Sequence, residues 1–172
     1  MSGIVRRIDS LGRVVIPKEI RKVLKIKENE QIEINVVDDI ITLDKYTDIH
    51  ENDKSIIKLI NSLKDTFNKD IIITSLSKIV LATKDYKDYI DLELSSYLVN
   101  IIENRKNIDE LIPISLNLSD LKENIKVAFS IKSIIINGDI IGLVILLTNS
   151  NLEEDDLKLL KFLNSYLENY LE

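Results

Sequence analysis

Basic side chains are concentrated at the start of this 172-residue chain. Residues 1–27 hold eight of the 23 lysines and arginines against two carboxylates, a net charge of +6, whereas residues 28–172 carry −12. Guanidinium and ammonium groups gathered in this way bind phosphates, and two such segments side by side would hold a nucleic-acid backbone at physiological salt. The total charge of −6 therefore conceals two parts of opposite sign.

Five cations are the candidate contacts to double-stranded DNA. They are Arg6, Arg7, Arg13, Arg21 and Lys22. The first two precede a predicted turn at 9–12, the third follows it, and the last two lie on the polar face of a predicted helix that begins at Pro17. Charge alone explains a solvated protein surface equally well, so the assignment depends on the motif in which these residues stand.

The same segment contains no side chain suited to reading adenine. Residues 1–27 have no Asn and no Gln, the two side chains that pair bidentately with that base. Direct base contacts would rest on arginine to guanine, with Ser10 as a minor option. We therefore expect much of any sequence preference to come from groove shape and DNA flexibility.

The elements that position these residues form a small first domain. The polar stretch 44–55 predicts a boundary, with domains at 1–50 and 51–172. The first domain reads as strand 3–8, turn 9–12, strand 13–16, a helix from Pro17, strand 32–36 and a reversal into 41–43. About 46 residues without cysteine are too few for a stable separate core, which predicts an obligate dimer through residues 1–46.

The second domain reads as a single α/β unit. Helices are predicted at 55–67, around Leu94 to Ile102 and at the C-terminus, where Ser150 or Asn151 is the expected N-cap. Strands are predicted at 70–76, 78–83, 112–116, 131–136 and 140–147, the last two joined by an Asn137-Gly138 hairpin turn. Leucines spaced three and four residues apart in the last helix predict core packing or a helix-helix seam.

The string GIVRRIDSLGRVVIPKEIRKVLKIKENEQIEI, residues 3–34, resembles the DNA-binding domain of the AbrB-type bacterial transition-state regulators. The resemblance implies a swapped-hairpin β-barrel built by two chains and a regulator of sporulation and transition-state genes. It also implies DNA contacts at the matching basic positions, which are Arg6, Arg13, Arg21 and Lys22. The expected fold class is α+β: a dimeric swapped-hairpin barrel followed by a sensor domain.

The second domain resembles a GAF-type α/β sensor domain in the order of its elements. Such domains commonly bind small molecules and signal through their flanking helices, so an unidentified ligand is possible here, and pairing of these helices would extend the dimer to a tetramer. Tyr86, Tyr89 and Tyr97 either line a pocket or pack in the core, and core packing is favoured. The acidic pairs 38–39, 153–154 and 155–156 fit turns and helix starts better than a metal or acid-base site.

The composition also limits other classes of function. There is no Cys and a single His, His50, and only two glycines follow residue 27, which argues against an enzyme and against a metal or cofactor site. No apolar run approaches a membrane span and the N-terminus lacks a signal-peptide pattern, so we expect a cytoplasmic, nucleoid-associated protein. The alternative is an antitoxin-like DNA-binding protein whose C-terminal domain binds a protein partner.

Overall fold

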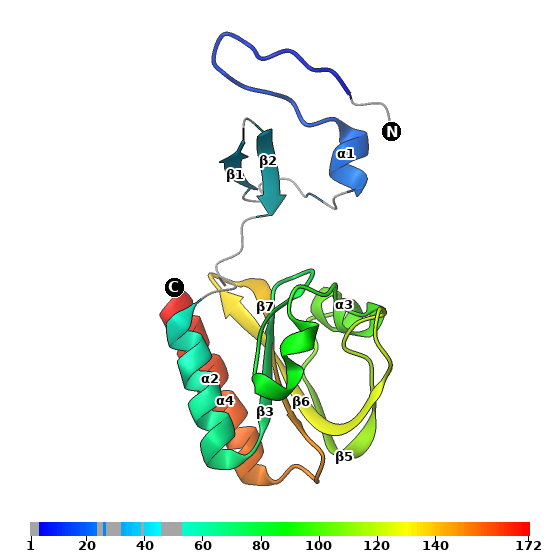
Figure 1. Ribbon diagram of the computed structural model, residues 1–172, viewed down its shortest axis with the longest axis vertical. Coiled ribbons are helices and arrows are strands. Elements are labelled where there is room, and N and C mark those ends of the chain that lie inside the picture. The colour runs from blue at the N-terminus through cyan, green and yellow to red at the C-terminus, as the bar shows by residue number, and fades with distance from the viewer. Residues whose placement is uncertain (1–3, 24–25, 27–31, 39, 46–52) are drawn as a thin grey trace. The chain divides into compact units, whose positions relative to one another are not determined.

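The computed structural model describes residues 4–23, 26, 32–38, 40–45 and 53–172 (Figure 1). The chain divides into two compact units, residues 1–46 and 47–172. Some residues used in the sequence interpretation lie outside the described ones: Gly3, Leu24, Lys25, Lys27, Asp39 and His50.

The described residues of the first unit form one short helix and one strand hairpin. Helix α1 (Lys18–Val23) begins directly after Pro17, whose carbonyl accepts a 2.9 Å hydrogen bond from the Arg21 N–H. Strands β1 (Ile32–Val37) and β2 (Ile40–Lys45) pair antiparallel. The helix after the proline and the hairpin predicted from the sequence are therefore confirmed.

The strands expected at 3–8 and 13–16 are not present within the described residues. Residues 4–9 and 13–17 flank the turn without belonging to a strand, and they form the long excursion before α1 in Figure 1. A strand needs a neighbour to accept and donate its backbone hydrogen bonds. The two segments are joined next to the turn by a 3.1 Å hydrogen bond from the Asp9 N–H to the Arg13 carbonyl, and no strand ladder continues from it among the described residues.

The second unit is built on a five-stranded antiparallel sheet with the strand order β4-β3-β7-β6-β5. Its strands are β3 (Asp70–Thr74), β4 (Ile79–Ala82), β5 (Ile108–Leu116), β6 (Ile125–Ile136) and β7 (Asp139–Thr148). Its helices are α2 (Lys54–Phe67), α3 (Ser96–Glu103), α4 (Glu154–Leu171) and the 3₁₀ segment η1 (Lys84–Tyr89). The α+β class and the order expected for a GAF-like domain are confirmed.

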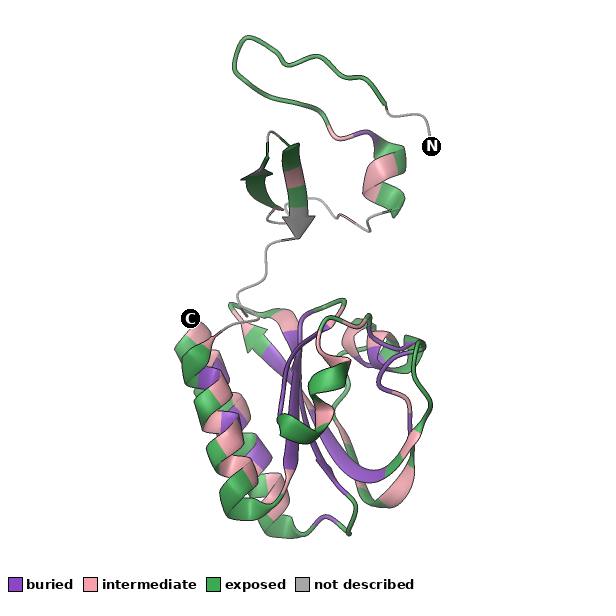
Figure 2. Ribbon diagram, in the orientation of Figure 1, coloured by how far each residue is buried: buried purple, intermediate pink, exposed green. Residues whose placement is uncertain are grey.

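Helices on opposite faces of the sheet create two hydrophobic layers. On one face α2 and α4 pack through Ile56, Ile60, Leu160, Leu163 and Leu167, all fully buried. On the other face α3 packs through Leu98 and Ile101 against strand residues such as Phe129. The central strands in Figure 2 are accordingly buried over most of their length, because both of their faces are covered.

Local sequence signals explain where the helices of this unit begin and end. Asp53 caps α2 by accepting from the Ser55 and Ile56 N–H groups, and Asn68 ends the helix in the left-handed conformation. Helix α4 starts two to three residues later than predicted. Its N-cap is Glu153, paired with Asp156 in a capping box, so the expectation of Ser150 or Asn151 is wrong.

The hairpin between β6 and β7 forms where the sequence predicted it. Asn137 and Gly138 both have positive φ, 51° and 86°, as a two-residue type I′ connection requires. Strand β6 starts six residues before its predicted start at 131. Helices within the described ranges are all too short or too polar to cross a membrane.

Candidate DNA-binding surface and sensor domain

The turn at residues 9–12, between Arg7 and Arg13, is fixed by the carboxylate of Asp9. Asp9 Oδ1 accepts the backbone N–H groups of Leu11 and Arg13, each at 2.9 Å, and Gly12 donates to the Asp9 carbonyl at 3.0 Å. Gly12 has φ +78°, a conformation that glycine adopts without strain. Asp at the first position and Gly at the fourth are the residues that such a turn favours.

Asp9 also holds the side chain that follows the turn. Arg13 Nε donates to Asp9 Oδ2 at 2.8 Å, while the Arg13 side chain stays 71% exposed. The backbone N–H of Arg13 and then its guanidinium lower the pKa of Asp9 below the ordinary value. The sequence interpretation counted Asp9 only as a charge and a turn residue; its spacing of four from Arg13 was the available signal. The result is a cation presented to solvent in a fixed position.

The other four candidate cations lie on either side of this turn in the chain. Arg6 and Arg7 are exposed in the segment before it, and Lys22 is exposed in the last turn of α1. Guanidinium and ammonium groups only donate hydrogen bonds, so these exposed cations are available to phosphate oxygens.

Arg21 differs from the other candidates. It is only partly exposed, and its Nε is buried without a hydrogen-bond partner among the described residues. A buried guanidinium nitrogen normally has an acceptor, and leaving it without one costs free energy. An acceptor from outside the described part of the chain would satisfy this N–H.

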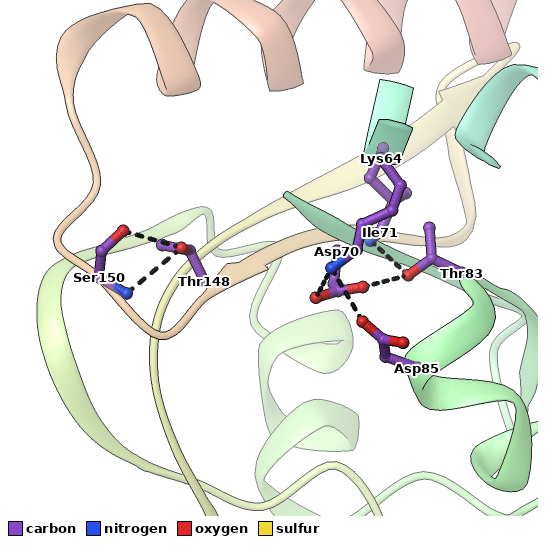
Figure 3. Close-up of polar contacts among 7 residues, drawn as sticks. All are labelled: Lys64, Asp70, Ile71, Thr83, Asp85, Thr148 and Ser150. Atoms are coloured by element: carbon purple, nitrogen blue, oxygen red, sulfur yellow. Dashed lines mark hydrogen bonds and ion pairs between the residues drawn. The ribbon is translucent and has the colours of Figure 1, made fainter. Parts of the chain in front are cut away.

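Among residues 53–172, Asp70 is a buried carboxylate and belongs to a polar network at the start of β3. Asp70 accepts from Lys64 Nζ at 2.7 Å and from Thr83 Oγ1 at 2.8 Å, as Figure 3 shows. Lys64 also lies 3.0 Å from Asp85. Burial alone would lower the pKa of Lys64, but hydrogen bonds to these two carboxylates raise it overall. The network connects α2 to β3, and its Lys64 ammonium is paired with the Asp70 and Asp85 carboxylates. We therefore interpret it as a structural ion-pair network.

The tyrosines and acidic pairs take structural positions. Tyr86 and Tyr89 pack against the α3 side of the core with ring centroids 5.8 Å apart, whereas Tyr97 is 41% exposed. Burial raises the pKa of Tyr86 to about 12, assisted by the Asp70 carboxylate. The acidic residues 153–156 form the cap and first turn of α4, as predicted. In the part of the chain that the structure describes, no three metal-ligating side chains cluster.

Two family models match the chain, one on each part. The model described as "Stage V sporulation protein T C-terminal, transcription factor" matches residues 53–172. The model described as "Antidote-toxin recognition MazE, bacterial antitoxin" matches residues 5–57. The first match covers more than half of the chain.

Curated relatives agree with this division. Stage V sporulation protein T of Bacillus subtilis is 34% identical over 147 residues, covering 84% of this chain and 83% of the relative. Transition state regulatory protein AbrB of the same organism is 56% identical over 45 residues, 26% of this chain and 47% of the relative.

Among solved structures, a type II free methionine-R-sulfoxide reductase from Thermoplasma acidophilum has a similar fold. The TM-score is 0.51 at 11% identity, covering 68% of this chain and 89% of that one. At this identity the likeness concerns the fold alone. Because a family model matches residues 53–172 and a relative that is 34% identical covers 84% of the chain, the chain belongs to the stage V sporulation protein T family of transcription factors.

Proposed function

We propose that this protein is a DNA-binding regulator of sporulation and transition-state genes whose first domain, residues 1–50, holds duplex DNA. The observation that carries the proposal is the solvent-exposed Arg13, fixed by Asp9 at the end of a turn inside the +6 segment. Arg6, Arg7, Arg21 and Lys22 supply the remaining contacts. The 56% identity to AbrB over 45 residues supports assigning DNA binding to this part of the chain.

The DNA-binding unit acts as a dimer through residues 1–46. In a single chain this unit buries only Pro17 among its described residues, and it leaves a long series of apolar side chains in solvent. They are Ile4, Val5, Ile8, Leu11, Val14, Val15, Val23, Ile34, Val36, Ile40, Ile41 and Leu43. A unit of this size with so little core needs a second copy to cover these side chains. The unpaired segments 4–9 and 13–17 are suited to form strands with that copy.

The second domain senses a signal and extends the assembly. Helix α4 turns its leucines into the core and exposes a row of aromatic rings at Phe162, Tyr166 and Tyr170, which are 60%, 37% and 44% exposed. The spacing of four places these rings on one face of the helix. An apolar stripe of this kind fits pairing with the same helix of another dimer, which would give a tetramer.

This function needs no catalytic chemistry. The chain has no Cys and one His, and family membership points to transcription control instead of catalysis. A DNA partner places the protein in the cytoplasm, on the nucleoid. We infer no resident cofactor.

The match to the antitoxin model at residues 5–57 keeps a second function in view. An antitoxin would use its C-terminal part to bind a toxin. The second unit here is instead a folded domain with two complete hydrophobic layers, which favours sensing over wrapping a partner. Recovery of a stoichiometric toxin with the purified protein would favour the antitoxin function.

The salt dependence of binding to a duplex tests the DNA surface. If four of these five cations in each chain contact phosphates, a dimer makes about eight contacts, so the slope of log K against log salt is near −7, about 0.9 per contact. Arg13→Ala removes one contact per chain and weakens the slope by about 2. Lys126→Ala, at an exposed lysine of the second unit, is the matched control and leaves the slope unchanged.

Two results would contradict the assignment. A wild-type slope shallower than about −3 would mean that most of these cations do not touch DNA. A folded, dimeric Arg13→Ala variant that binds duplex DNA with wild-type affinity would show that Arg13 and its turn do not contact DNA.

A further inference from the structure

A cavity lies between β6 and α4, on the sheet face that α2 and α4 cover. Its volume is about 420 Å³, within the usual range of small-molecule sites. Strand β6 provides Ser133 and Ile135 to its lining, and α4 provides Leu157, Lys161, Asn164 and Glu168. It is separate from the tyrosine-lined layer on the opposite face of the sheet.

Two buried polar atoms in this lining have no hydrogen-bond partner within the described part of the chain. Ser133 is 6% exposed and its Oγ is buried without a partner, and Asn164 Oδ1 is buried in the same condition. The other polar groups of these residues are occupied. The Ser133 N–H donates to Asn107 Oδ1 at 3.1 Å, and Asn164 Nδ2 donates to Glu168 Oε1 at 3.1 Å. Since buried polar groups normally have partners, this hydroxyl and amide oxygen are the groups that an occupant would satisfy.

The cavity has a positive end and a negative end. Lys161, Asn164 and Glu168 follow one another at intervals of three and four residues, so they lie along one face of α4. Lys161 makes no ion pair among the described residues, whereas Lys132, which also lines the cavity, is already held by Asp109 at 2.9 Å. Glu168 Oε1 accepts from the Ile135 N–H at 3.0 Å. The free ammonium and the carboxylate therefore stand on either side of the unpartnered amide oxygen.

We propose that this cavity binds a small zwitterion, a molecule with a carboxylate and an ammonium joined by a short apolar body. The ligand carboxylate pairs with Lys161, and its ammonium donates to Glu168 and to Asn164 Oδ1. The Ser133 hydroxyl donates to the ligand carboxylate, and Ile135 and Leu157 cover the apolar part. This inference rests on the sensing role in the proposed function and names the site and ligand class for it. A free amino acid and a short peptide share this chemistry.

Helix α4, which lines the cavity, also contacts the start of α2 at the beginning of the domain. Two residues after Glu168, the Tyr170 hydroxyl donates at 3.3 Å to Asp53 Oδ1. That carboxylate caps α2, accepting from the Ser55 and Ile56 N–H groups at 2.9 and 3.1 Å. A ligand that contacts Asn164 and Glu168 would therefore shift α4. The last turn of that helix carries Tyr170, which contacts the Asp53 cap of α2.

The test is calorimetric titration of the full chain with ε-aminocaproate, which carries both charges at the ends of an apolar chain. Caproate and hexylamine each lack one charge and are the matched probes. Norleucine, with both charges on one carbon, distinguishes an amino-acid ligand from a longer one. We expect ε-aminocaproate or norleucine to bind and to raise the unfolding temperature, and the single-charge probes to bind roughly tenfold more weakly or worse.

Charge-neutral variants locate the site. Lys161→Gln and Glu168→Gln each weaken binding by roughly tenfold, the loss expected for one charge-assisted contact, and Gln at 168 still accepts from the Ile135 N–H. Lys158→Gln, one turn away and paired with Glu154 and Asp155, is the control and leaves binding unchanged. Absence of binding by both zwitterions, unchanged binding in both variants, or a soaked crystal with only water in the cavity would overturn the proposal.

The same proteins separate this inference from the DNA-binding proposal. Arg13→Ala is expected to bind the zwitterion normally while its DNA binding is weakened. Lys161→Gln is expected to bind DNA normally in the absence of the zwitterion. A negative result for zwitterion binding therefore does not contradict DNA binding, and a negative result for DNA binding does not contradict the ligand site.

Discussion

The Tyr170 hydroxyl at the end of α4 lies 3.3 Å from the carboxylate of Asp53, which caps α2 117 residues earlier in the chain. This contact joins the last helix to the first helix of the second unit. We expect Asp53→Ala to lower the free energy of unfolding by about 0.5–2 kcal/mol, because two N–H groups of α2 lose their acceptor. Tyr170→Phe, at an exposed site, costs about 1 kcal/mol or less. Urea denaturation of both variants measures the difference, and an equal loss in the two would show that the cap does not stabilise α2.

Two serines of β6, three residues apart, are expected to respond in opposite ways to alanine. Ser130 is fully buried and donates to Asp109, so Ser130→Ala is expected to cost about 0.5–1.5 kcal/mol, the net value of one hydrogen bond, since Lys132 still donates to that exposed carboxylate. Ser133 Oγ has no hydrogen-bond partner among the residues that the structure describes, so Ser133→Ala is expected to be neutral or stabilising. Chemical denaturation without added ligand compares them. A large loss for Ser133→Ala would reveal a partner for its hydroxyl.

Adjacent residues of α4 separate core packing from assembly. Leu163 is fully buried, and Leu163→Ala is expected to lower stability by about 2–5 kcal/mol through the cavity that it leaves. Phe162 is 60% exposed, and Phe162→Ala is expected to change the unfolding free energy of the domain by about 0.5 kcal/mol or less. The Phe162 variant should instead reduce the mass of the assembly in light scattering. Unaltered mass would place the tetramer contact elsewhere.

Alkaline pH is expected to destabilise the second unit through Tyr86. Its pKa is about 12 in the folded chain against 10.0 for the free side chain, because burial disfavours the phenolate. The raised pKa means that its contribution is complete below pH 10 and is lost as the pH rises toward 12. Spectroscopic titration of phenolate should show one late-titrating group that is missing in Tyr86→Phe. A Tyr86→Phe variant with the same late group would assign it to another tyrosine.

Asp9 is expected to affect DNA binding in two opposite ways: its negative charge weakens binding, and its hydrogen bonds hold the turn that positions Arg13. Asp9→Asn keeps an oxygen for the Leu11 and Arg13 N–H groups and removes a negative charge from the basic segment, so duplex DNA should bind more tightly. Asp9→Ala also removes the acceptor, which frees the turn and the position of Arg13. Its affinity is expected to fall below that of Asp9→Asn in fluorescence anisotropy at fixed salt. Identical affinities would mean that the turn conformation does not matter for binding.

Local signals in the sequence were sufficient for most elements of the second unit. The helix over 54–67, the Asn137-Gly138 hairpin and the buried strands follow from periodicity and turn chemistry, which act over a few residues. The strands expected at 3–8 and 13–16 did not form in the single chain, because strand pairing depends on a neighbour that the local pattern does not supply.

The sequence by itself determined the segregation of charge, the basic residues of the candidate DNA surface and the family motif, since all of these are properties of consecutive residues. Only the tertiary structure decided that Asp9 holds Arg13, that Arg21 Nε is buried, and that a cavity opens between β6 and α4. The cavity brings together Ser133 and Asn164, which the chain separates by a hairpin, a strand and most of a helix. Such a juxtaposition arises from packing across the sheet, and no local pattern of residue types encodes it.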